Sequence, residues 1–117
     1  MKKTMILAAA LLFAQMAFAG FYTGNDLKKW ADASSRISQG TSFGSDGHFA
    51  STLKGFIVGV ADAQEGDLIC VPTGTTVGQI TAMVVKFVND HPEAWNKDAG
   101  ILVMYALVPD FPCKKSQ

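Results

Sequence analysis

The sequence has very few of the side chains that build metal sites or nucleophilic active sites. Among its 117 residues are only two cysteines, Cys70 and Cys113, and two histidines, His48 and His91. There is no C-x-x-C motif and neither histidine lies near a cysteine in sequence, so no metal site is predicted. A nucleophile–base pair built from these residues has little support either. We therefore expect no enzyme activity, no catalytic residue, no metal and no cofactor.

Long hydrophobic runs are also scarce, and the clearest apolar stretch lies at the N-terminus. Lys2 and Lys3 precede an apolar stretch, Met5–Ala14, that is too short to span a bilayer. Ala17-Phe18-Ala19 then supplies the small residues that a signal peptidase accepts. The sequence therefore predicts a cleaved secretory signal peptide over residues 1–19 and a protein exported most simply to a bacterial periplasm.

The remaining residues, 20–117, lack both a membrane-spanning run and a basic excess. Lys86 and Asp90 interrupt the longest apolar stretch, so we expect no membrane association after cleavage. Removing Lys2 and Lys3 from the ten basic residues leaves eight against ten acidic ones, and the net charge becomes −2. This charge excludes the basic footprint of a nucleic-acid-binding protein. The length predicts a single domain.

Export determines which chemistry is expected of the two cysteines. In an oxidising compartment they most simply form one disulfide between Cys70 and Cys113, although two free thiols or an intermolecular bridge also fit the sequence. A small domain gains from such a cross-link because its hydrophobic core is modest. The bond would tie the end of the chain to the Pro/Thr/Gly turn that follows Cys70.

Capping motifs and apolar spacing predict an all-α fold, a compact four-helix domain. Thr23 with Asp26, and Thr76 with Gln79, have the spacing of capping boxes. The apolar positions with helical spacing are, helix by helix, Leu27, Trp30 and Ala31; Phe49, Leu53, Phe56, Ile57 and Val60; Val77, Ile80, Val84, Phe87 and Val88; and Trp95, Ala99, Leu102, Val103 and Ala106.

Glycine, serine and proline mark the boundaries of these helices. The Gly/Ser-rich segment 39–47 predicts a loop, with Ser45 or Asp46 as the cap of the second helix. Gly66 is expected at the end of that helix, and Pro92 is suited to the first turn of the fourth.

Three small residues, Gly55, Gly59 and Ala63, are spaced four apart and form a ridge on the second helix. Glycine costs about 1 kcal/mol relative to alanine in a helix interior. We therefore expect the ridge to lie in a tight contact with a neighbouring helix.

Five segments follow one another along the chain: "FYTGNDLKKW", "LKGFIVGVADA", "CVPTGTTVGQI", "VVKFVNDHPEAWNKDAGILVMYAL" and "FPC". In this order they resemble the Rap1a/Tai family of small periplasmic proteins, over essentially all of residues 20–117. The resemblance implies an immunity protein that dimerises and plugs the active site of a type VI secretion amidase effector, which cuts peptidoglycan. The expected partners are therefore a peptidoglycan amidase effector and a second copy of the chain.

The chain departs from many members of this family because it lacks a second cysteine pair. By spacing, those cysteines would fall near Ala31 and Leu53. Both positions are apolar here, so we expect packing to replace the second bond.

The segment "NDHPE", residues 89–93, best fits a plug that enters a cleft. It is a short break between two helices, and its proline fixes φ, so little ordering entropy is lost on binding. Asp90, His91 and Glu93 can hydrogen-bond to the cysteine–histidine site that the resemblance implies for the toxin. We therefore predict these three as partner-binding residues. The acidic segment 63–67 is a second candidate, and a plain helix–helix corner is the simpler interpretation of residues 89–93.

Two functions follow from these observations. The first is a periplasmic immunity protein that inhibits a peptidoglycan-cleaving effector. The alternative is a periplasmic helical structural or chaperone-like binding module with no toxin partner.

Overall fold

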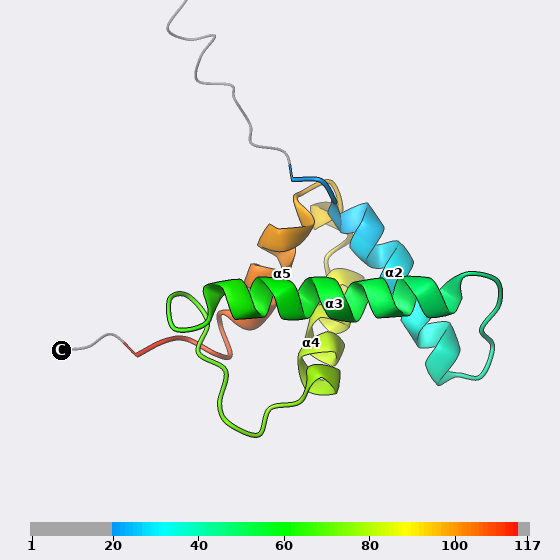
Figure 1. Cartoon of the computed structure of the whole chain (residues 1–117). Helices are drawn as coiled ribbons and strands as arrows, with labels where there is room; N and C mark the ends of the chain where they lie inside the picture. Colours follow the sequence, from blue (N-terminus) through cyan, green and yellow to red (C-terminus); the bar gives the residue numbers. More distant parts are fainter. Residues whose placement is uncertain (1–19, 115–117) are drawn as a thin grey trace, which may run out of the picture.

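The computed structural model describes residues 20–114, which contain four α-helices and one short 3₁₀ helix (Figure 1). The helices are α2 (Gly24–Ser38), α3 (Asp46–Gln64), α4 (Val77–Asp90) and α5 (Ala99–Leu107), with η1 (Pro92–Ala94) between the last two. The expected all-α, four-helix fold is confirmed. The predicted signal peptide, residues 1–19, lies outside the described residues.

The longest helix, α3, crosses the other three and covers them on one side (Figure 1). Its most extensive contact is with α2, whereas α4 packs mainly on α5 and α2. The core between the helices is built mainly from apolar positions that the periodicity predicts, with Ile69 added from the segment after α3 and Leu107 from the end of α5. The fully buried large side chains are Leu27, Leu53, Ile57, Ile69, Leu102, Leu107, Val84, Val88 and Val103.

Both predicted capping boxes are present, and they set where α2 and α4 begin. The backbone N–H of Thr23 donates to Asp26 Oδ2 at 2.9 Å. At α4, the N–H of Thr76 donates to Gln79 Oε1 at 2.7 Å, and Thr76 Oγ1 accepts from the N–H of Gln79 at 3.1 Å. These bonds satisfy donors that have no partner within the helix.

The fourth helix differs from its prediction, because Trp95 lies outside it. Pro92 begins η1 rather than the long helix, and α5 begins only at Ala99. The chain between them caps the start of α2: the carbonyl of Trp95 accepts from the N–H of Asn25 at 2.8 Å, and that of Lys97 accepts from the N–H of Gly24 at 2.9 Å. These carbonyls can reach α2 only because the segment is not helical.

Two smaller expectations were also wrong. The loop predicted to extend to Gly47 ends earlier, since α3 begins at Asp46. Val77 was expected in the buried stripe of α4 but is exposed. It is the first residue of that helix and precedes the turns that reach the core.

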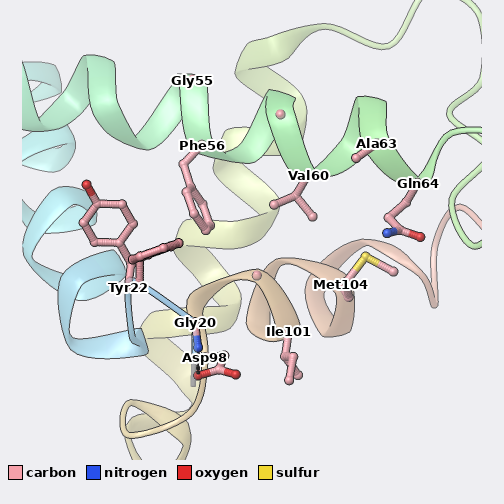
Figure 2. A pocket seen from close by; sticks show the side chains of 13 residues that line it. Gly20, Tyr22, Gly55, Phe56, Val60, Ala63, Gln64, Asp98, Ile101 and Met104 are labelled. Atoms are coloured by element: carbon pink, nitrogen blue, oxygen red, sulfur yellow. Dashed lines mark hydrogen bonds between the residues drawn. The ribbon is translucent and has the colours of Figure 1, made fainter. Parts of the chain in front are cut away.

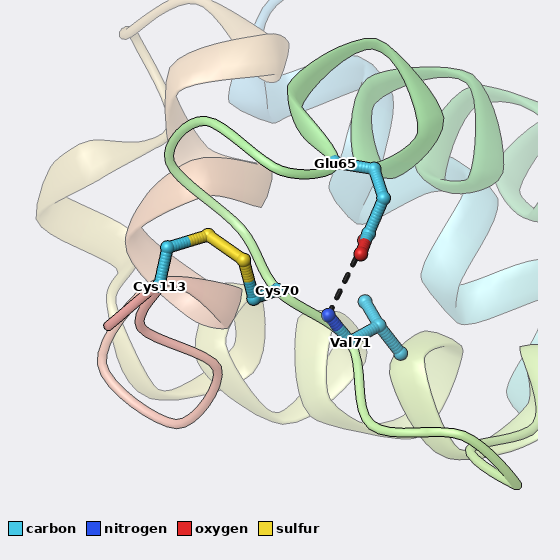
Figure 3. The surroundings of a disulfide bond; sticks show 4 residues. All are labelled: Glu65, Cys70, Val71 and Cys113. Atoms are coloured by element: carbon cyan, nitrogen blue, oxygen red, sulfur yellow. Dashed lines mark hydrogen bonds between the residues drawn. A yellow bond between two sulfur atoms is a disulfide. The ribbon is translucent and has the colours of Figure 1, made fainter. Parts of the chain in front are cut away.

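The two cysteines form the expected disulfide. Cys70 and Cys113 are bonded, with their Cα atoms 4.9 Å apart, and this bond joins positions separated by 43 residues. Beside it the N–H of Cys70 donates to the carbonyl of Phe111 at 2.9 Å. Glu65, at the end of α3, accepts from the N–H of Val71 at 3.2 Å (Figure 3). The C-terminal tail is thus fixed to the segment between α3 and α4.

An ion pair closes the loop between α2 and α3. Arg36 binds Asp46 through two bonds, Nε to Oδ2 at 2.8 Å and Nη2 to Oδ1 at 2.7 Å. Asp46 is buried and also accepts from the N–H of Phe43 at 3.0 Å. The hydrogen bonds from Arg36 and from Phe43 lower the pKa of Asp46 to about 2.

Replacing Cys113 by serine should lower the melting temperature by roughly 15 °C or more. In the chain-entropy model, opening a loop of this length removes about 4 kcal/mol of stability, and 1 kcal/mol corresponds to about 4–8 °C in a domain of this size. Differential scanning calorimetry of oxidised protein would measure the change. A variant that melts with the wild type would show that the bond contributes little.

Acid should weaken the Arg36–Asp46 ion pair in a defined pH window. The pKa of Asp46 is about 2 in the folded chain and 3.8 ordinarily, so protonation favours the unfolded state. The stabilisation is complete above about pH 4 and is lost as the pH falls towards 2. Urea unfolding of wild type and Asp46→Asn at several pH values should show a stability difference that shrinks across this window. A pH-independent difference would contradict the assignment.

Candidate binding surfaces

The glycine ridge of α3 faces solvent rather than a helix, so the expected tight contact is wrong. Gly55, Gly59 and Ala63 are all exposed. A Cβ atom built on Gly55 or on Gly59 would have no neighbour within 4 Å among the described residues. The small side chains therefore open a space on the surface instead of admitting a neighbouring helix of the same chain.

That space is a groove between α3, α5 and the segment that precedes α2 (Figure 2). It has a volume of about 760 Å³. Its lining is mainly apolar and consists of Gly20, Phe21, Tyr22, Gly55, Phe56, Gly59, Val60, Ala63, Gln64, Asp98, Gly100, Ile101 and Met104. Asp98 is the charged residue of this lining, so the groove offers contact to apolar surfaces rather than acid–base chemistry.

The N-terminal segment forms one end of the groove and is well anchored. The Tyr22 ring packs edge-on against Trp30, with centroids 5.0 Å apart, and against Phe56 at 6.0 Å. The carbonyl of Tyr22 accepts from the N–H of Ala99 at 2.9 Å. The N–H of Gly20 donates to Asp98 Oδ1 at 3.0 Å. In Figure 2 these residues lie opposite Ala63 and Gln64, which form the other end.

The α5 side of the groove carries apolar side chains that the fold does not cover. Every residue of α5 is apolar or glycine, a composition typical of a helix buried on all sides. Yet Ile101 is 44% exposed and Tyr105, one turn further along, is 54% exposed. Phe21, which lines the same groove as Ile101, is fully exposed. Exposed apolar side chains that gather in this way are typical of surfaces that bind other macromolecules.

Sequence reasoning missed this groove, although two signals pointed to it. The segment "AGILVMYAL" of α5 has no polar face. A helix that packs against its own chain on one side needs apolar residues on that side alone, so the apolar residues on the other side were a signal of uncovered surface. The glycine ridge was the second signal, but it was assigned to packing inside the chain.

The predicted partner-binding residues lie together at the corner between α4 and η1. His91 Nδ1 is 2.9 Å from Glu93 Oε1, and the His91 ring packs on Phe87 with centroids 4.4 Å apart. Asp90, the last residue of α4, pairs with Lys86 Nζ at 2.5 Å. Apart from the half-buried His91 and Phe87, these side chains are exposed, so the corner presents a polar surface. Asp90, His91 and Lys86 also line a small hollow beside α5.

Each acid of this corner already has an internal partner. The hydrogen bond from Lys86 lowers the pKa of Asp90, and the hydrogen bond with His91 lowers the pKa of Glu93. Both carboxylates are thus held ionised and oriented. They still offer free lone pairs to donors on a partner, because a carboxylate accepts several hydrogen bonds.

The residues of the second candidate segment for partner binding, 63–67, lie in different surroundings. Ala63 lines the groove, and Glu65 is engaged with the N–H of Val71. Gly66 has a φ of 81° and ends the helix region as predicted. Asp67 is exposed. No cluster of three potential metal ligands occurs within residues 20–114.

The comparison with known proteins identifies the family. Residues 23–113 match the family of Rap1a immunity proteins. The chain belongs to this family. The match includes all four helices and both disulfide cysteines. A search of curated proteins found no relative.

The two residues near which the family resemblance places a second cysteine pair, Ala31 and Leu53, belong to the core here. Ala31 and Leu53 are both buried, with relative exposures of 1% and 0%. Apolar packing thus occupies the place of the second disulfide, as expected.

Alanine at the ridge should stabilise the protein, unlike alanine at a packed glycine. Within a single chain, Gly55→Ala and Gly59→Ala meet open space, so each should raise the free energy of unfolding of the monomer by about 0.5–1 kcal/mol. At Gly24 the new Cβ would lie 2.6 Å from both Trp95 Cα and Leu102 Cδ1, so Gly24→Ala should destabilise by about 1–3 kcal/mol. Urea unfolding would measure all three. Destabilisation at the ridge would show that it is covered.

Proposed function

We propose that this Rap1a family protein is a periplasmic immunity protein that binds and inhibits a type VI secretion amidase effector, which cleaves peptidoglycan. The observation that carries the proposal is the family match over residues 23–113. Family membership makes this an immunity-type protein for a secreted effector. The amidase chemistry and the secretion route of that effector are the finer part of the proposal.

Export supports the periplasmic location. Residues 1–19 have the composition of a signal peptide, and we propose that they are removed after Ala19. Among the helices of the described residues, none is long and apolar enough to cross a membrane. Peptidoglycan lies in the same compartment, so an inhibitor located there would meet the effector at its substrate.

We propose the corner of Asp90, His91 and Glu93 as the contact with the effector. Internal partners orient both carboxylates, so binding costs little side-chain entropy. The packing of His91 on Phe87 fixes the imidazole as well. A preorganised polar corner of this kind can hydrogen-bond to catalytic groups in the cleft of an effector.

We further propose that the protein is a homodimer that uses the apolar groove. Phe21 and Ile101 line the groove, and Tyr105 extends the same side of α5. A two-fold contact would bury this face on both copies at once. The groove and the corner share no residue, so a dimer could still present two corners to two effector molecules.

The groove also supports a second candidate function, that of a chaperone-like module that binds apolar segments in the periplasm. Its mainly apolar lining would suit an extended or helical peptide. This function predicts a monomer that binds unfolded chains and no affinity for a peptidoglycan amidase.

The triple variant Asp90→Ala, His91→Ala and Glu93→Ala should bind the effector at least tenfold more weakly. It removes the oriented acceptors, and loss of central interface contacts costs more than about 1 kcal/mol. The probe is a purified type VI secretion peptidoglycan amidase, with affinity measured by calorimetry. Circular dichroism would verify that the variant keeps its helices.

The matched control is Asp62→Ala with Asp67→Ala, which removes the same number of acids from exposed positions elsewhere. It should bind like the wild type. If the control loses affinity and the triple variant does not, the contact lies at the acidic segment. If the amidase does not bind the wild type, the proposed effector is wrong.

Ile101→Asp combined with Tyr105→Asp should convert the dimer to a monomer. Both side chains are exposed on α5, so the variant should fold while the apolar contact is lost. Light scattering after size exclusion would measure the mass. Phe43→Asp, at an exposed aromatic outside the groove, is the control and should stay dimeric. A monomeric wild type would exclude the homodimer and favour the chaperone-like function.

A further inference from the structure

We propose that removal of the signal peptide creates an ion pair that fixes the rim of the groove. The partners are the new α-ammonium group of Gly20 and the carboxylate of Asp98. The inference rests on the proposed cleavage after Ala19, and its geometry is already present in the described chain. The backbone nitrogen of Gly20 lies 3.0 Å from Asp98 Oδ1 and donates to it.

Asp98 is placed to receive this charge. It is the N-cap residue of α5, a position where aspartate ordinarily accepts from backbone N–H groups in the first turn of its own helix. The Asp98 side chain makes no such bond. It is directed to Gly20 instead, and Cγ lies 3.5 Å from the position of a Cβ built on that glycine. Figure 2 shows the two residues together at one end of the groove.

Hydrolysis changes the charge of this contact. Cleavage of the Ala19–Gly20 peptide bond consumes one water molecule, and the new carboxyl group leaves with Ala19. The nitrogen stays on Gly20 and takes up protons, because an ordinary α-amino group has a pKa of about 7.7–8.0 and a nearby carboxylate favours its charged form. A neutral N–H donor becomes a charge-assisted one.

The ion pair would complete a series of bonds that hold the N-terminal segment. The N–H of Gly24 donates to Lys97, and the N–H of Ala99 donates to Tyr22, both at 2.9 Å. Thr23 pairs with Asp98 in an antiparallel bridge. The Gly20–Asp98 contact is the outermost of these. In the sequence Phe21 lies between Gly20 and Tyr22, whose ring packs edge-on against Trp30. Pairing at Gly20 therefore orders Phe21 and the rim of the groove.

The electrostatics explain why a carboxylate is needed there. The N-terminus of α5 carries a partial positive charge from the aligned peptide dipoles of the helix, and this would repel an ammonium group. Asp98 lies between the helix end and Gly20 and offsets that repulsion. With asparagine at position 98 the hydrogen bond could form, but the ammonium would face the helix end unneutralised.

The test compares chains that begin at Gly20 with chains that begin at Ala19, each with and without Asp98→Asn. All are released from a fusion by a protease that leaves no extra residue. One added residue moves the ammonium by about 3.3–3.6 Å and restores an amide at Gly20. Asp98→Asn should lower the melting temperature by about 2–4 °C in the Gly20 chain and by less than half of that in the Ala19 chain.

A second measurement reports on the amine itself. Modification of the N-terminal amine by 2-pyridinecarboxaldehyde should be several-fold slower in the Gly20 chain than in its Asp98→Asn variant, and equally fast in the two Ala19 chains. Asp110→Asn, which removes an exposed acid outside the groove, should change neither readout. Two results together would overturn the ion pair. The Gly20 chain would be modified as fast as its Asp98→Asn variant, and Asp98→Asn would lower the melting temperature equally in the Gly20 and Ala19 chains.

The intact mass of the exported protein separates this inference from the proposed processing. A mature chain that begins at Gly20 supports the link to maturation. A chain that begins elsewhere overturns that link, even if the engineered Gly20 chain forms the ion pair. Effector binding is measured independently and does not affect either result.

Discussion

The arrangement of the whole domain depends on how the first turn of α2 is capped. Gly24 and Asn25 donate their backbone N–H groups to the carbonyls of Lys97 and Trp95. This contact requires a glycine, because a Cβ at position 24 would collide with Trp95 and Leu102. It also requires that residues 95–98 stay non-helical. One contact between distant parts of the chain therefore joins the start of the domain to its last helix and separates η1 from α5.

The groove is a consequence of that capping contact. It holds residues 20–23 beside α5, where Tyr22 packs on Trp30 and Phe56. The three walls of the groove then come from segments that are far apart in sequence. Because the glycine ridge contributes no side chains, α3 and α5 leave apolar surface uncovered. The fold thus retains exposed apolar area at a place where hydrogen bonds and aromatic packing hold the N-terminal segment in position.

The features that were predictable from the sequence are those with local causes or a simple chemical context. Each capping box depends on residues three apart, such as Thr76 and Gln79, and both were identified correctly. The disulfide followed from two cysteines in an exported chain. The non-helical turn at Trp95 could not be predicted, since its cause is an N-terminus of α2 that lies far away in sequence. The glycine ridge was predicted to pack against a neighbouring helix, and this was wrong, because the spacing of small residues does not show whether the chain itself covers them.

The disulfide and the polar corner lie at opposite ends of α4. The bond between Cys70 and Cys113 fixes the segment that leads into α4, and α4 carries the corner at its far end. Trp95 supports the corner from the other side, since its Nε1 donates to the carbonyl of Val88 at 2.8 Å. The residues of the corner are therefore ordered by packing at both ends, while their own ion pairs lie at the surface. A substitution at the corner should therefore leave the stability of the fold nearly unchanged, because exposed ion pairs contribute little to stability. The side chains of the corner can thus vary while the caps, the core and the disulfide keep the backbone beneath them in place.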